Sequence, residues 1–189
     1  MKLHKDIKIE SVCSKDKARY AISEPYLDIT DGNGTLVSTN GKALAVVPVD
    51  INEHDVAGYV CADGLKAARK AASKRGDAEL TANGDIRLAN GLAMPRTGNA
   101  GECNYPNWKA VIPDFTGKQT VSIAIDAAML MDLAKAIGTQ GVKLTFAVDD
   151  TGKPAGTAIK VTPTSAGVFG SVKPACDNAH GIIMPIRTE

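Results

Sequence analysis

The sequence predicts an α+β protein with antiparallel sheets and two main helices, arranged as repeated β-α-β-β-β units. Two helical stretches each follow an Asp and end at a Gly, and short strand-like runs are separated by turns rich in Asn and Gly. We expect one domain, residues 1–189, with two pseudo-repeats at 1–115 and 116–189. With 189 residues, 44% of them hydrophobic, the chain can bury a sizeable core.

The opening part of the chain is expected to form strands. The stretch Asp31-Gly32-Asn33-Gly34 predicts a hairpin turn, because Gly and Asn tolerate the positive φ that such turns require. A second turn at Asn40-Gly41 should join strands over 36–38 and 44–49, and another strand is expected over 58–61.

The first helix is expected over 64–75, with Asp63 as its N-cap and Gly76 just beyond its end. A carboxylate at the N-cap accepts hydrogen bonds from the otherwise unsatisfied amides of the first turn. Short strands are expected after the helix, at 79–81, 86–88 and 92–94.

The same pattern is expected again after Pro113. A strand over 120–125 should lead to Asp126, the cap of a second helix from Ala127 to Ile137 that ends at Gly138. Its apolar residues recur at the spacing of one helix face, which predicts packing on a core. These residues are Leu130, Leu133, Ala134 and Ile137. Further strands are expected at 142–148, 158–162 and 182–186.

Three segments carry a resemblance to a known family. They are S-T-N-G-K-A-L-A-V from Ser38, N-Y-P-N-W-K-A-V-I-P from Asn104 and G-I-I-M-P-I-R from Gly181. In order and kind they resemble the segments that line the partner-peptide pocket of the bacterial DNA polymerase III β sliding clamp. The resemblance covers roughly residues 19–188 and implies a DNA clamp-like fold. Bacterial members have three domains, so this chain looks like a shortened clamp of a kind that a phage or mobile element could carry.

The resemblance also implies a groove for partner peptides. Ala43 and Ala110 stand where the family has arginines, so we expect a less polar rim. Aliphatic and Met side chains suit an adaptable apolar slot. The alternative is that these residues are ordinary strand ends and core. The expected groove residues are Thr39, Gly41, Leu44, Pro106, Val111, Ile182, Met184, Pro185 and Ile186.

The first helix predicts contact with DNA. At ~100° per residue, Lys66, Arg69 and Lys70 fall on one face, with Lys74 at its margin. Such a face would attract phosphates without reading base sequence. The alternative is an ordinary solvated face, because Lys and Arg favour helices.

Other features narrow the class of protein. The three His have no metal-ligand spacing with each other or with the Cys, so we expect no metal. The sequence has no Walker phosphate-binding motif and no G-x-S-x-G motif, so we expect no cofactor and no enzyme activity. A secretory leader or membrane span is not expected, and the scattered Cys fit reduced thiols, which favours the cytoplasm. An enzyme with an unrecognised site remains a weaker alternative.

The combined expectation is a sliding clamp-like processivity factor or adaptor. It would hold duplex DNA non-specifically, bind DNA polymerase or other clamp-binding proteins through the groove, and assemble as a homo-oligomer to encircle DNA. The main alternative is a peptide-binding decoy or inhibitor of host replication that does not encircle DNA.

Overall fold

The computed structural model describes most of the chain in two compact units, Met1–Pro113 and Asp114–Glu189, each of which is considered by itself. The described residues are 1–4, 6–16, 18–53, 55–71, 78–79, 81–83, 85–87, 93–95, 105–152, 154, 158–164, 166–167, 170–171 and 179–186. Among them, no helix has the length and apolar character that spanning a membrane requires.

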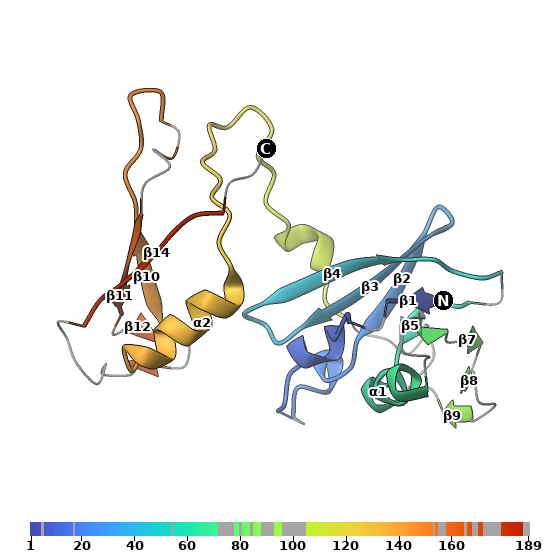
Figure 1. Ribbon diagram of the computed structural model, residues 1–189. Coiled ribbons are helices and arrows are strands. Elements are labelled where there is room, and N and C mark those ends of the chain that lie inside the picture. Colours follow the sequence, from blue (N-terminus) through green and yellow to red (C-terminus); the bar gives the residue numbers. More distant parts are fainter. Residues whose placement is uncertain are drawn as a thin grey trace. The chain divides into compact units, whose positions relative to one another are not determined.

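A four-stranded antiparallel sheet forms the centre of the first unit, in the order β4-β3-β2-β5 (Figure 1). Both predicted hairpins are confirmed. The tight turn between β2 and β3 has φ of 51° at Asp31 and 75° at Gly32, so both residues are left-handed. The strands are β2 (Tyr26–Thr30), β3 (Asn33–Thr39), β4 (Leu44–Val49) and β5 (Gly58–Tyr59).

The two faces of this sheet have different partners. Leu27 and Leu36 are opposite each other in the register and are fully buried in one core with Leu65 and Ala68 of α1 (Ala62–Ala71). Side chains alternate along a strand, so Tyr26, Val37 and Val46, which are also aligned, belong to the other face. In Figure 1, the short 3-10 helix Trp108–Val111 lies across the sheet from α1.

The start of α1 differs from the prediction. Asp63 is not its N-cap, because the helix begins at Ala62 and Asp63 lies in its first turn. The amide of Ala62 donates to the carboxylate of Glu24, which comes from the segment before β2. Burial raises the pKa of Glu24, and the amide of Ala62 opposes this effect. Glu24, which is distant in the sequence, therefore satisfies the first amide of α1, where the sequence had predicted Asp63 as the cap.

Short elements complete the first unit. Two further 3-10 helices, Ile9–Val12 and Tyr20–Ile22, lie between β1 and β2. β1 pairs with β6, and β7, β8 and β9 form a three-stranded antiparallel sheet. The strands are β1 (Lys2–Leu3), β6 (Ala78–Glu79), β7 (Thr81–Asn83), β8 (Asp85–Arg87) and β9 (Ala93–Pro95).

The second unit packs α2 (Ala127–Ala136) on an antiparallel sheet of order β10-β11-β14. The predicted cap is confirmed, since Asp126 accepts from the amides of Ala128 at 2.8 Å and Met129 at 3.0 Å. The strand expected over 120–125 is not a strand in the structure. The strands are β10 (Val142–Thr145), β11 (Ile159–Pro163), β12 (Ala166–Gly167), β13 (Gly170–Ser171) and β14 (Gly181–Ile183).

The predicted apolar stripe of α2 contributes to the core of the second unit. Leu130, Leu133 and Ile137 pack on Ile159, Val161 and Ile183, the buried residues of the sheet. β14 approaches this helix closely at Gly181, because a Cβ there would lie 2.4 Å from Cδ1 of Leu133 and the leucine side chain would have to shift. The helix and the strand therefore approach closely through the absence of a side chain.

Candidate partner-binding groove and basic helix

The segment that follows residue 104 is fastened to the outer face of the first sheet, the face opposite α1. The ring of Tyr105 stacks on Tyr26 with centroids 4.9 Å apart, and Tyr59 meets both rings edge to face. The hydroxyl of Tyr59 donates to the carbonyl of Ala21 at 3.2 Å. This aromatic cluster sets where the segment enters the sheet face.

Asp28 of β2 holds the next part of the segment. Its Oδ2 accepts from the indole Nε1 of Trp108 at 3.1 Å and forms an ion pair with Nζ of Lys109 at 3.0 Å. Burial alone would raise the pKa of Asp28, but hydrogen bonds from Lys109, Thr30 and Trp108 outweigh it, so this pKa is lower than usual. The ionised carboxylate therefore anchors the short 3-10 helix Trp108–Val111.

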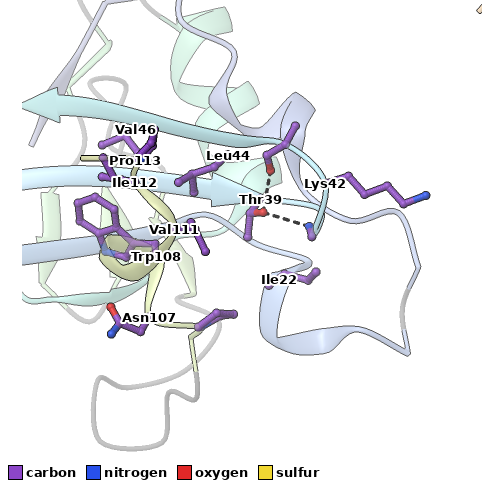
Figure 2. A pocket seen from close by; sticks show the side chains of 13 residues that line it. Ile22, Thr39, Lys42, Leu44, Val46, Asn107, Trp108, Val111, Ile112 and Pro113 are labelled. Atoms are coloured by element: carbon purple, nitrogen blue, oxygen red, sulfur yellow. Dashed lines mark hydrogen bonds between the residues drawn. The ribbon is translucent and has the colours of Figure 1, made fainter. Parts of the chain in front are cut away.

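An apolar groove of about 700 Å³ lies between this anchored segment and the turn that joins β3 to β4. Figure 2 shows Trp108, Val111 and Ile112 facing Leu44 and Val46 of β4. The lining residues are Ile22, Thr39, Gly41, Lys42, Ala43, Leu44, Val46, Pro106, Asn107, Trp108, Val111, Ile112 and Pro113.

The turn that forms one wall is internally hydrogen-bonded. Thr39 Oγ1 accepts from the amide of Gly41 at 3.0 Å and donates to the carbonyl of Ala43 at 2.7 Å. Asn40 Oδ1 accepts from the amides of Lys42 and Ala43, both at 2.9 Å. Gly41 has φ of 83°, which side chains other than that of glycine rarely permit. This wall is therefore shaped before any ligand arrives.

The structure brings part of the predicted groove together. Thr39, Gly41, Leu44, Pro106 and Val111 all line it. The other predicted residues belong to the second unit, where Ile182, Met184 and Ile186 are exposed and Pro185 is half-buried. Because each unit is described by itself, their place in the groove stays a proposal.

Sequence reasoning missed several lining residues. Val46 shares the outward face of β4 with Leu44, so strand alternation could have identified it. Trp108, Ile112 and Pro113 lie in a segment that the sequence did single out. Ile22 gave no such signal, because its contribution depends on how the 3-10 helix Tyr20–Ile22 folds against the turn.

The basic face of α1 differs from the prediction. The expectation that Arg69 points outward is wrong: its side chain is only 12% exposed and forms a two-pronged ion pair with Glu10, which is 6% exposed. Arg69 also donates to the carbonyl of Ile7 at 3.2 Å. Arg69 therefore joins α1 to the N-terminal segment.

Lys66 and Lys70 are exposed on α1, as predicted. Lys66 Nζ lies 2.9 Å from Oδ1 of Asp63, and this hydrogen bond lowers the pKa of Asp63 and raises that of Lys66. No carboxylate partner is found for Lys70 within the described part of the chain. Lys74 lies outside the described residues. Fewer cationic side chains are therefore exposed and unneutralised on the described part of α1 than the sequence indicated.

Metal chemistry has no evident site in the part of the chain that the structure describes. No group of three or more His, Cys, Asp or Glu side chains gathers there in a way that could hold a metal ion. Cys13 is buried against Ser38, with 3.1 Å between Sγ and Oγ, and burial raises the pKa of its thiol.

Comparison with solved structures shows a clamp-like fold. The chain is similar to the DNA polymerase III β subunit of Borrelia burgdorferi (TM-score 0.59, 16% identity), whose structure holds a natural product. It is also similar to the β sliding clamp of C. crescentus (0.59, 17%) and to that of Bartonella birtlesii bound to griselimycin (0.63, 17%). No family model and no curated protein matches the sequence.

The likeness covers nearly all of this chain but only part of each clamp. The matches include 94–95% of this chain and 45–47% of the clamp chains. The chain therefore has a clamp-like fold, with the α+β architecture and antiparallel sheets that the sequence predicted, and it spans less than half the length of the clamps it matches.

Replacing Asp28 with Asn should loosen the segment around Trp108. The change weakens two charge-assisted contacts, and we expect a loss of about 1–3 kcal/mol in docking of the segment. Trp108 is the single tryptophan, so its emission should shift to the red and acrylamide should quench it more readily. Circular dichroism should stay unchanged, and Asp150→Asn, at an exposed turn in the second unit, should have no effect.

Lowering the pH should loosen the segment around Trp108 in the parent protein, as the Asp28→Asn change does at neutral pH. Because the pKa of Asp28 is lower in the folded chain than its ordinary value of 3.8, its stabilising effect is present above that pH. This effect is lost as the pH falls through the folded-state pKa. If Trp108 fluorescence changed with falling pH in the same way in the parent and in Asp28→Asn, the anchoring role of Asp28 would be contradicted.

Replacing Glu10 with Gln should destabilise the first unit, because it leaves the guanidinium of Arg69 buried without its counter-charge. We expect a loss of about 3 kcal/mol in the free energy of unfolding, measured with urea. Asp63→Asn breaks an exposed pair on the same helix and should change stability by less than about 1 kcal/mol. Equal effects of the two changes would show that Arg69 is not a structural residue.

Proposed function

We propose that this protein is a clamp-like binding module, a processivity factor or adaptor that carries no covalent chemistry. Its groove takes a short extended peptide segment of a DNA polymerase or of another clamp-binding protein, and a cytoplasmic location follows from this role. The observation that carries the proposal is the apolar groove of about 700 Å³ in the first unit. Its size lies in the range of ligand pockets, roughly 300–1,000 Å³.

The surface of the groove favours an apolar occupant. Val111 is 68% exposed, and Val46 and Ile112 are also exposed to water. Covering such surface contributes about 25 cal/mol per Å² before ordering costs are subtracted. Because the hydrogen bonds that Asp28 accepts from Trp108 and that Thr39 donates to Ala43 already fix the walls, little ordering of the protein is needed on binding.

The second unit contributes a further apolar surface in this proposal. Ile182, Met184 and Ile186 occupy alternate positions of one segment, and each is exposed. Alternate residues of an extended chain share one side, so these three side chains form an apolar strip whose chemistry resembles that of the groove, with Pro185 between two of them. We propose that this strip contacts the same partner segment.

DNA holding is the second part of the proposal. Lys66 and Lys70 on α1 supply the cations that could contact phosphates, and Lys74 is proposed to extend this face. The chain spans less than half the length of the clamps it matches, and identical chains commonly assemble with closed cyclic symmetry. We therefore propose a homo-oligomer for any DNA-bound form.

A non-encircling decoy or inhibitor of host replication is the alternative candidate. The ion pairs of Lys66 with Asp63 and of Arg69 with Glu10 favour it, because they reduce the positive charge that α1 offers to DNA. Such a protein would keep the groove and compete for clamp-binding segments. The two candidates therefore share the groove and differ in DNA binding.

Replacing Val111 with Glu should weaken peptide binding by about 2 kcal/mol or more, because it places a charge against the apolar lining. The ligand is a tryptophan-free clamp-binding peptide from a polymerase tail, titrated against the fluorescence of Trp108. Val56→Glu makes the same change at an exposed valine that does not line the groove and should bind like the parent. Met184→Glu tests the strip of the second unit separately. A parent that fails to bind, or variants that all bind equally, would remove the groove from the account.

Replacing Lys66 and Lys70 together with Glu should abolish any duplex DNA binding while leaving the fold intact. Fluorescence anisotropy with labelled duplexes of unrelated sequence measures this, and affinity of the parent should fall steeply with salt. Lys143→Glu with Lys160→Glu, at exposed positions of the second sheet, gives the same charge change as a control. A parent that does not bind duplex at low salt, or a double variant that binds equally, would reject DNA holding and favour the decoy.

A further inference from the structure

The strand that forms one wall of the groove is also an edge strand. In the order β4-β3-β2-β5, β4 is paired with β3 on one side only (Figure 1). We call the side of β4 that faces away from β3 the open edge. Leu44 and Val46 line the groove with their side chains, and Val46 and Pro48 are exposed. A ligand in the groove therefore lies beside the backbone of this edge.

Three observations fix the direction of the backbone groups in β4. At the turn, the amide of Asn40 donates to the carbonyl of Ala43 at 3.3 Å, so the backbone of Ala43 is directed toward β3. Pro48 has no amide hydrogen to give to a ladder, which suits a position directed away from the neighbouring strand. Just beyond β4, the carbonyl of Asp50 accepts from the amide of Lys2 in β1 at 2.8 Å.

These observations agree on one pattern, because backbone groups point to alternate sides along a strand. Ala45 and Val47 direct their amides and carbonyls toward β3, whereas Leu44, Val46 and Pro48 direct theirs to the open edge. Within the described residues of the first unit, no strand pairs with Leu44 or Val46 on that edge. Leu44 and Val46 each offer an amide and a carbonyl there, and Pro48 offers a carbonyl.

The length and surroundings of this open stretch favour a short peptide. The β3–β4 turn ends the stretch on one side, and the pairing of Asp50 with Lys2 ends it on the other. That pairing also shows that the same edge accepts an extended segment further along the chain. In recognition by strand addition, main-chain hydrogen bonds supply affinity, and pockets for alternate side chains supply specificity. The open edge and the apolar groove provide these two parts side by side.

We propose that the partner segment binds as an added β-strand on the open edge of β4, with its backbone hydrogen-bonded to Leu44 and Val46. This inference rests on the proposed peptide-binding function and adds the backbone conformation of the ligand. Alternate side chains of the added strand face the groove, where they contact Val46 and Val111, and the side chains between them point to the opposite face of the sheet. The ligand is therefore an extended segment without proline at the positions that pair.

N-methylated peptides test the proposal. The starting ligand is the tryptophan-free clamp-binding peptide from a polymerase tail. Each backbone amide is methylated in turn, so that one hydrogen-bond donor is lost while every side chain is kept. Binding is measured by calorimetry and by Trp108 fluorescence. We expect every second methylation to weaken binding by about five-fold or more, because it removes a hydrogen bond to β4, and the methylations between to change binding by less than about two-fold.

Amide hydrogen exchange locates the pairing on the protein. In the free protein, the amides of Leu44 and Val46 should exchange quickly, and those of Ala45 and Val47, which are directed toward β3, should exchange slowly. Saturating peptide should slow exchange at Leu44 and Val46. Val46→Ala keeps the amide of this position and Val46→Pro removes it, so the proline variant should bind more weakly than the alanine variant. If circular dichroism shows that the proline variant is unfolded, the methylated peptides decide, because they require no change in the protein.

The possible outcomes separate this inference from the function on which it rests. Equal binding of all methylated peptides, or unchanged exchange at Leu44 and Val46, would overturn the inference and leave the groove standing. Slow exchange of these two amides in the free protein would also overturn it, in favour of a second copy at this edge where the rate depends on protein concentration. Failure of the unmethylated peptide to bind the parent would instead overturn the proposed function itself.

Discussion

The hydrogen bonds that Asp28 accepts from Trp108 and Lys109 are the constraint on which the candidate site depends. Without them the segment from Tyr105 to Pro113 would be held to the sheet chiefly through its aromatic entry point. With them, a stretch that has only one turn of 3-10 helix becomes a fixed wall opposite β4. A partly buried carboxylate with several donors is a strong anchor because its charged form is the one the donors favour.

The same sheet serves two purposes because its side chains alternate. Leu27 and Leu36 bury the inner face against α1, while Tyr26 and Val46 present apolar surface on the outer face. An antiparallel sheet with one solvated face would ordinarily carry polar residues there. Here the anchored segment covers part of that apolar face, and the groove is what it leaves uncovered.

Local signals in the sequence were sufficient for the two hairpins and for the cap of the second helix. Asp31-Gly32 and Asp126 act through contacts within a few residues, which sequence patterns record well. The cap of α1 and the inward position of Arg69 depend on Glu24 and Glu10, which lie far away in the chain. Helix periodicity placed Arg69 on a face but could not show that a distant carboxylate occupies that face.

Only part of the groove could likewise be predicted from the sequence. The turn at Gly41 and the segment around Trp108 were identified, whereas Ile22 and the role of Asp28 emerged only from tertiary contacts.

The central claim is that this groove on the outer sheet face receives the partner segment. Mapping NMR amide and methyl shifts while a clamp-binding peptide is added tests it most directly. The account predicts that the largest changes fall at Leu44, Val46, Trp108 and Val111, with α1 unaffected. Changes concentrated on α1, or spread evenly over the chain, would contradict it.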